Sequence, residues 1–131
     1  MRIVVDTNVF VSGIFFTGPP HAILKAWSDR RLTIVYSPEI LEEYCRILDE
    51  LEKEFDNISS QPFIILLITY GELCVPRKAY RGLCRDAADE KFIACAVEGN
   101  ARYIVSGDRD LLEASLEAVK IVSPRQFCNL Y

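Results

Sequence analysis

Two aspartates closely follow short apolar runs that have the composition of buried β-strands. Asp6 follows residues 3–5, which read IVV, and Asp108 follows residues 103–105, which read YIV, after one Ser-Gly pair. Short, continuously apolar and β-branched runs are typical of strands that are covered on both faces. Ligands of parallel α/β sheets bind beyond the carboxyl ends of the strands. We therefore expect both carboxylates at the ligand-binding edge of a sheet.

Two further acids lie on the inward faces of expected helices. Residues three or four positions apart share a helix face, so Glu43 falls in the apolar stripe of Ile40 and Ile47, whereas Glu42 falls among polar residues. By the same spacing Asp89 shares a face with the apolar positions 92, 93 and 96. A buried carboxylate without a partner is costly. A group that offsets the charge of these two acids is therefore expected.

The four acids together have the chemistry of a divalent-metal site. We find no lysine or arginine in the same inward stripes that would pair with them, and carboxylates brought together raise one another's pKa. Oxygen ligands suit Mg²⁺ or Mn²⁺ rather than zinc. We therefore predict a Mg²⁺ or Mn²⁺ site whose metal ligands and catalytic residues are Asp6, Glu43, Asp89 and Asp108. Asp110 suits either a further ligand or the N-cap of the helix that follows.

Each acid also has a purely structural interpretation, which stays open at this point. Asp6 and Asp108 would serve as turn or cap residues, and Glu43 would lie at the edge of an amphipathic helix. Asp86 and Asp89 have the spacing of an N-cap and a first-turn acid, and Asp86 suits a cap better than a ligand.

The elements that must position these acids alternate between strands and helices. We expect strands at residues 3–5, 32–36, 73–75, 103–105 and 119–122, and helices at residues 18–29, 37–55, 61–70, 87–98, 109–116 and from 123 onward. Residues 57–60 read as a break. Ser37-Pro38 starts a helix, and Gly99-Asn100 ends one. This alternation predicts a three-layer α/β/α sandwich around a mostly parallel central sheet, and the 131 residues of the chain form one domain, 1–131.

The charge balance does not favour a general polyanion binder. The formal net charge is −4, whereas such proteins usually carry a basic excess. Acids that hold metal ions lower the net charge without repelling a phosphate, so nucleic acid stays open as a substrate. A basic loop and one flanking arginine suit the RNA backbone: Arg77, Lys78, Arg81, Arg85 and Arg109. Tyr80 lies among them and would stack on a base, although a solvated loop explains the cluster equally well.

The chain has the features of a cytoplasmic protein. Its five cysteines include no pair with the C-x-x-C spacing, so we interpret them as reduced thiols. The apolar run before Asp6 is too short for a signal peptide. Residues 63–68, the longest later run, are far shorter than a bilayer span. We expect no membrane partner.

Three segments of the chain read, in order, VVDTNVFVSG, SPEILEEYCRIL and RDAADEKFIACAVEGNARYIVSGDRDLL. They resemble the motifs of the PIN domain family, metal-dependent ribonucleases that include the VapC-type toxins of toxin–antitoxin pairs, and the resemblance covers essentially the whole chain. It implies that Asp6, Glu43, Asp89 and Asp108 bind metal and that Asn8 helps to order Asp6. Two departures are visible: Ala88 stands where this subfamily often has another acid, and Ser106 replaces a usual threonine but keeps the hydroxyl.

The resemblance implies a PIN-like fold, often as a homodimer, and a function. We expect a Mg²⁺- or Mn²⁺-dependent endoribonuclease that is the toxin of a toxin–antitoxin pair, with RNA as its substrate and an antitoxin as a protein partner. One alternative is a catalytically inactive PIN-like module that binds RNA or protein or serves dimerisation. Another is a phosphotransfer enzyme with Asp6 as nucleophile, which is less supported because Asn8 stands where its second acid would be.

Overall fold

The computed structural model describes residues 1–55, 58–112 and 119–131. Its strands are β1 (Arg2–Val5), β2 (Thr33–Tyr36), β3 (Glu72–Leu73), β4 (Tyr103–Val105) and β5 (Lys120–Val122). Its helices are α1 (Thr7–Phe15), α2 (Pro19–Ser28), α3 (Pro38–Glu52), α4 (Gln61–Tyr70), α5 (Glu90–Glu98), α6 (Arg109–Leu112) and α7 (Pro124–Leu130), and a 3₁₀ turn, η1 (Ala87–Asp89), precedes α5.

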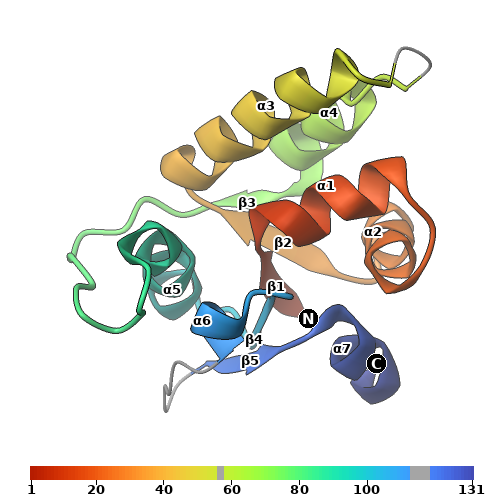
Figure 1. The fold of residues 1–131 in the computed structure, drawn as a ribbon. Helices are drawn as coiled ribbons and strands as arrows, with labels where there is room; N and C mark the ends of the chain where they lie inside the picture. Colours follow the sequence, from red (N-terminus) through yellow and green to blue (C-terminus); the bar gives the residue numbers. More distant parts are fainter. Residues whose placement is uncertain (56–57, 113–118) are drawn as a thin grey trace.

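The five strands form one sheet in the order β3-β2-β1-β4-β5, and each of the described strand pairs is parallel. Strand β1 lies at the centre, with Ile3 in register with Ile34 of β2 and Tyr103 of β4. Helices α5 and α6 lie on one side of the sheet and α1, α2 and α7 on the other, while α3 and α4 extend past the β3 end (Figure 1). The expected α/β fold class, with its mostly parallel central sheet, is confirmed.

Helix α1 is an element that the sequence did not lead us to expect, because we assigned nothing to residues 7–17. Its sequence, TNVFVSGIF, is rich in β-branched and aromatic residues and contains a glycine, all of which lower helix propensity. Tertiary packing overrides this preference: Val9, Phe10 and Phe15 are buried, and Phe10 stacks on Tyr44 of α3 with 4.2 Å between ring centroids. Helix α1 begins directly after Asp6, and its buried side chains fix this end of β1 against the core.

Several expected boundaries were wrong by a few residues. Helix α3 ends at Glu52 rather than at residue 55, and β3 comprises Glu72–Leu73 rather than residues 73–75. The helix expected over 87–98 begins as the 3₁₀ turn, so Asp89 precedes the α-helix and does not lie in its first turn. The end of the helix expected over 109–116, and the first residue of the break at 57–60, lie outside the described residues.

The core centres on the sheet and the helices that cover it. Ile3, Val4 and Val5 of β1 are fully buried, as are Ile34 of β2 and Ile104 of β4. This burial explains why β1 reads as an unbroken apolar run rather than an alternating one. Among the described residues, no helix has the length and apolar character needed to cross a membrane.

Candidate active site

The four predicted acids line one cavity of about 200 Å³ at the carboxyl edge of the sheet. Asp6 follows β1, Asp108 follows β4, Glu43 projects from α3, and Asp89 ends the 3₁₀ turn before α5. The strand order reverses between β1 and β4, which is the position where open α/β sheets bind ligands. Segments more than a hundred positions apart in sequence thus bring carboxylates to the same cavity.

Asp6 is held rigidly by its neighbours. The residue is 4% exposed; the Val9 amide donates to Oδ1 at 2.9 Å, and the Ser106 hydroxyl donates to Oδ2. The Ser106 oxygen in turn accepts from the Asp108 amide at 2.9 Å. One buried hydroxyl therefore connects the ends of the two strands that flank the cavity, which is consistent with an orienting role for Ser106.

The surroundings of Asp6 disfavour its charged form. Burial, the largest cause, raises the pKa of Asp6 from 3.8 to about 6, although the hydrogen bonds from Ser106 and Val9 lower it in part. The nearby carboxylates of Asp108 and Glu43 raise the pKa further. A cation in the cavity would relieve the same penalty.

Asp89 has a buried carboxylate oxygen whose charge no donor in the described part of the chain offsets. Its Oδ2 is buried, and no donor among the described residues reaches it. Burial, followed by the charge of the Asp108 carboxylate and by a hydrogen bond between the two carboxyl groups that needs a proton, raises the pKa of Asp89 from 3.8 to about 7. An oxygen atom that is neither solvated nor hydrogen-bonded is expensive to keep, so Asp89 and Asp108 together form the part of the cavity best suited to a metal ion.

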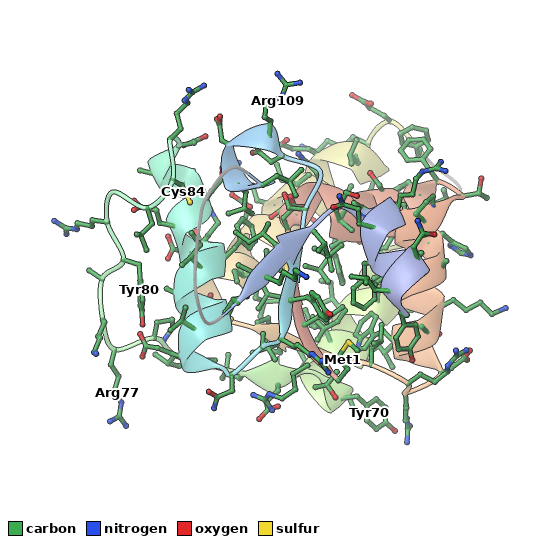
Figure 2. All side chains as sticks on the ribbon, turned by 90° about the horizontal axis from the view of Figure 1, so that it is seen from below. Met1, Tyr70, Arg77, Tyr80, Cys84 and Arg109 are labelled. Atoms are coloured by element: carbon green, nitrogen blue, oxygen red, sulfur yellow. The ribbon has the colours of Figure 1, made fainter. Side chains whose placement is uncertain are left out.

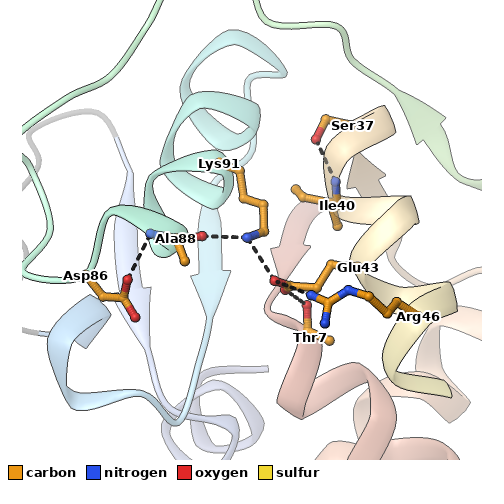
Figure 3. Close-up of polar contacts among 8 residues, drawn as sticks. All are labelled: Thr7, Ser37, Ile40, Glu43, Arg46, Asp86, Ala88 and Lys91. Carbon is orange, nitrogen blue, oxygen red and sulfur yellow. Dashed lines mark hydrogen bonds and ion pairs between the residues drawn. The ribbon is translucent and has the colours of Figure 1, made fainter. Parts of the chain in front are cut away.

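Glu43 has a different environment, because cations of the protein already contact it. Lys91 of α5 places its Nζ 2.9 Å from Glu43 Oε1, and the Thr7 hydroxyl donates to Oε2 (Figure 3). Arg46 is more distant, with 3.9 Å between Nη2 and Oε1. Our expectation that no lysine or arginine pairs with the inward acids was therefore wrong. Lys91 reaches across from α5 to α3, and comparing positions within a single helix does not reveal such a contact.

The donor set fits a hard divalent ion. The cavity offers carboxylate oxygens from four acids, with Asp86 as a fifth acid on its wall, and such ligands suit Mg²⁺ or Mn²⁺. Within residues 1–55, 58–112 and 119–131, no three His, Cys, Asp or Glu side chains form a ready-made metal cage. Binding would therefore draw the carboxylates closer together, which their mutual repulsion opposes while no cation is present.

The remaining predicted site residues take varied positions. Asn8 lines the cavity but is exposed, and Asp86 also caps the 3₁₀ turn by accepting from the Ala88 amide at 2.9 Å. Asp110 is not among the residues that line the described cavity; its amide donates to Asp108 Oδ1 at 2.8 Å. The roles of Asn8 and Asp110 in the site stay predictions.

The predicted RNA-contacting residues fall into three groups. Lys78 and Arg81 line a larger groove of about 520 Å³ together with Tyr80, which lies between its loop and α5 (Figure 2). Arg77 and Arg109 point away from the body of the protein in the same view. Arg85 is largely exposed, with its guanidinium 3.8 Å from the Asp110 carboxylate. Lys91 is shared between the two sites: it lines the groove and contacts Glu43 of the acidic cavity.

The loop that carries these cations is fixed by acids of α5. Glu98 accepts from the amides of Arg77 and Lys78 at 2.7 and 3.1 Å, and the Tyr80 hydroxyl also donates to it. Glu90 accepts from the Leu83 amide at 3.3 Å. The sequence shows the cations of this loop but not these anchors, because each joins residues on different elements.

Comparison with known proteins identifies the family. The model of the PIN domain family matches residues 2–110. The chain belongs to the PIN domain family. Uncharacterized protein MJ1680 of Methanocaldococcus jannaschii is 28% identical to it over 139 aligned positions, which cover 97% of this chain and 89% of that protein.

A PIN-like fold is also found in a solved structure. The crystal structure of VapBC2 from Rickettsia felis, bound to a DNA fragment from the promoter, contains a chain that superimposes with a TM-score of 0.60. The match covers 92% of this PIN domain and 97% of that chain, at 17% sequence identity. At this identity the likeness concerns the fold alone.

Proposed function

We propose that this PIN domain is a Mg²⁺- or Mn²⁺-dependent endoribonuclease. The observation that carries the proposal is the convergence of Asp6, Glu43, Asp89 and Asp108 on one cavity at the edge of the sheet, with a buried oxygen of Asp89 that lacks a donor. Membership of the PIN domain family supports the assignment, because the sequence motifs that carry these acids resemble those of its nucleases.

Each residue has a defined task in this proposal. Asp6, Asp89 and Asp108 hold the ion, Glu43 lines the same cavity, and Ser106 keeps Asp6 oriented through its hydroxyl. A bound Mg²⁺ or Mn²⁺ supplies activation of water and offsets charge on the phosphodiester. The single histidine, His21, lies in α2 and bonds to the Gly13 carbonyl, so it does not line the described acidic cavity. The site therefore has no imidazole base among its lining residues.

We further propose that the RNA strand runs from the acidic cavity into the neighbouring groove. Lys78 and Arg81 would neutralise phosphates there, while Tyr80 offers a ring on which a base stacks. Single-stranded RNA is the class of substrate that such a groove favours, because unpaired bases are free to stack.

The proposal includes a toxin–antitoxin context. The fold is shared with a chain of VapBC2, which is described as a complex bound to promoter DNA; we propose an antitoxin partner for this chain, a homodimer, and a cytoplasmic location. Exposed apolar side chains on α4, among them Ile65, Ile68 and Tyr70, support a protein contact at that helix.

The decisive test incubates the purified protein with a pool of single-stranded RNA and Mg²⁺ or Mn²⁺. An EDTA reaction and an Asp6→Asn variant serve as negative controls. The exposed acid Asp49 lies on the outer face of α3, so Asp49→Asn is a matched charge control. We expect cleavage that requires the metal, disappears with Asp6→Asn and persists with Asp49→Asn.

Calorimetry with Mn²⁺ separates this proposal from an inactive binding module. If the protein neither cleaves RNA nor binds Mn²⁺, the nuclease proposal is wrong and the PIN-like module for RNA or protein binding takes its place. Binding of Mn²⁺ that Asp6→Asn abolishes would support the metal site independently of which RNA is cut.

A further inference from the structure

We infer that Lys91 is a built-in cation of the acidic cavity, which holds Glu43 in place of a second metal ion. The cavity then takes one divalent ion, on the side of Asp6, Asp89 and Asp108. This inference rests on the proposed function, because it assigns positions within the proposed metal site.

The position of Lys91 is unusual for a lysine. Its side chain is only 9% exposed, although lysine usually keeps its ammonium group in water. Two acceptors satisfy the buried group: Glu43 Oε1 at 2.9 Å and the Ala88 carbonyl at 2.6 Å (Figure 3). The carbonyl belongs to the turn that also carries Asp89. The ammonium is thus fixed between the two helices that border the cavity.

Glu43 is the acid of the cavity whose charge the protein itself balances. Lys91 contacts Oε1 and Thr7 donates to Oε2, so both carboxylate oxygens already have partners. Asp89 presents the opposite case, with a buried Oδ2 that no described donor reaches. The demand for an external cation is therefore greatest at Asp89 and least at Glu43.

The position of Lys91 disfavours a second ion. One lysine and one divalent ion together offset three of the negative charges of the five acids on the cavity wall, Asp86 included. A second divalent ion at Glu43 would have to enter against the ammonium of Lys91 or displace it. Displacement would leave a buried lysine without its anionic partner, which is strongly unfavourable. The geometry therefore favours a single ion.

The test is a Mn²⁺ titration of the full chain by calorimetry, with electron paramagnetic resonance on the same samples. The variants are Lys91→Met, which keeps most of the length of the side chain without its charge, and Lys91→Arg, which keeps the charge. Lys120 is exposed on β5, so Lys120→Met is the matched control. Two Mn²⁺ ions about 3.5–4 Å apart would give a spin-coupled spectrum, and a single ion would not.

We expect the unmodified protein, Lys91→Arg and Lys120→Met to bind one uncoupled Mn²⁺ per chain. Lys91→Met should bind its first ion about tenfold more tightly, because a repelling charge has been removed, and should take up a second, coupled ion at the freed Glu43. Two coupled ions in the unmodified protein, or one ion of unchanged affinity in Lys91→Met, would overturn the inference. Absence of any Mn²⁺ binding by the unmodified protein would instead refute the proposed function.

A second pair of variants covers the case in which Lys91→Met does not fold. Glu43→Gln should keep one Mn²⁺ with affinity changed by less than about tenfold, whereas Asp89→Asn should lose on the order of a hundredfold or more. An equal loss in both variants would show that Glu43 is a direct ligand and would contradict the role inferred for Lys91.

Discussion

Ser106 donates its hydroxyl hydrogen to the carboxylate of Asp6, a residue 100 positions earlier in the chain. Both residues are buried, and each stands directly after one of the two neighbouring parallel strands β1 and β4. The same hydroxyl oxygen accepts from the Asp108 amide at 2.9 Å. The orientation of two proposed metal ligands thus depends on one hydroxyl group.

Ser106→Ala should lower both the affinity for Mn²⁺ and the free energy of unfolding. Asp6 would lose a buried donor, which should lower the free energy of unfolding by roughly 1–3 kcal/mol and weaken Mn²⁺ binding about 10- to 100-fold. Urea unfolding and calorimetry measure the two effects. Ser28→Ala removes an exposed hydroxyl that bonds to the Lys25 carbonyl and should change neither. Unchanged Mn²⁺ affinity in Ser106→Ala would show that Asp6 needs no such support.

The metal-free protein should lose stability as the pH rises from 5 to 8. The pKa of Asp6 is about 6 in the folded protein against 3.8 for the free side chain, so folding favours the protonated form. Its stabilising contribution is fully present below pH 3.8 and is lost as the pH rises to about 6. The total loss is roughly 3 kcal/mol, of which about 1.4 kcal/mol falls above pH 5. Asp89, with a pKa of about 7, acts in the same direction.

Urea unfolding between pH 5 and pH 8, with EDTA present, measures this dependence. Asp6→Asn should reduce the slope, because the amide does not titrate and its one oxygen keeps the hydrogen bond from the Val9 amide, while the part that Asp89 contributes stays. Mn²⁺ should stabilise the protein more at pH 8 than at pH 5, since its ligands must be deprotonated. A slope that is the same in Asp6→Asn would mean that other groups cause it.

The sheet and the acids could be predicted from the sequence because they leave local signals. Strands buried on both faces read as continuous apolar runs, as residues 3–5 and 103–105 do, and an acid in an apolar helical stripe stands out, as Glu43 does. Parallel topology then brings the strand ends to one edge. These signals suffice to expect Asp6, Glu43, Asp89 and Asp108 near one another, and the four residues line one cavity in the structure. Their roles as metal ligands stay a prediction.

Helix α1 and Lys91 could not be predicted for a common physical reason. Both depend on contacts between elements, and neither leaves a periodic local pattern. Helix α1 forms from a sequence of low helix propensity because its aromatic residues pack on α3. Lys91 is buried because Glu43, 48 positions away by residue number, lies opposite it on another helix. A count of the acidic residues in the sequence therefore overestimates the negative charge of the cavity, because it omits the ammonium group of Lys91.

Tyr44→Phe should destabilise the protein without changing the metal site. The Tyr44 hydroxyl donates to the Val5 carbonyl at the end of β1, and the side chain is fully buried. Its loss leaves a buried acceptor without this donor, which costs about 1–2 kcal/mol, while the ring keeps its stacking on Phe10. Thermal and urea unfolding measure the change, with Tyr70→Phe, at an exposed tyrosine, as the control. A stability equal to that of the control would show that the hydrogen bond contributes nothing.

Gly13→Ala should disturb the packing of α1 against α2. A Cβ at this position would lie 2.7 Å from Leu24 Cδ1 and 2.8 Å from the Pro20 carbonyl oxygen. Backbone has to move to relieve the second contact, so we expect a loss of roughly 1–3 kcal/mol of unfolding free energy. A Cβ at Gly107 meets nothing within 4 Å, and Gly107→Ala should leave the urea midpoint nearly unchanged. Equal midpoints for the two variants would contradict the tight approach of the helices.

Tyr80→Ala should weaken RNA binding if the groove beside the acidic cavity holds the substrate strand. Stacking of one base on an aromatic ring contributes about 1–3 kcal/mol, which corresponds to about 5- to 150-fold in affinity. Fluorescence anisotropy with a labelled single-stranded oligonucleotide in EDTA measures binding without cleavage. Tyr80→Phe loses the hydrogen bond to Glu98 but keeps the ring. Because the ring is what would stack on a base, this variant should bind RNA like the unmodified protein. Tyr70→Ala removes an exposed ring on α4 and should also leave binding unchanged.

The comparison of Tyr80→Phe with Tyr80→Ala separates stacking from support of the loop. Weakening by both variants would mean that the hydroxyl anchors the loop to Glu98 and that the ring itself does not contact a base. Weakening by Tyr80→Ala alone would place a base against the ring, next to Lys78 and Arg81. Because Lys91 lines this groove and also contacts Glu43, that result would direct the strand toward the acidic cavity along the side of α5.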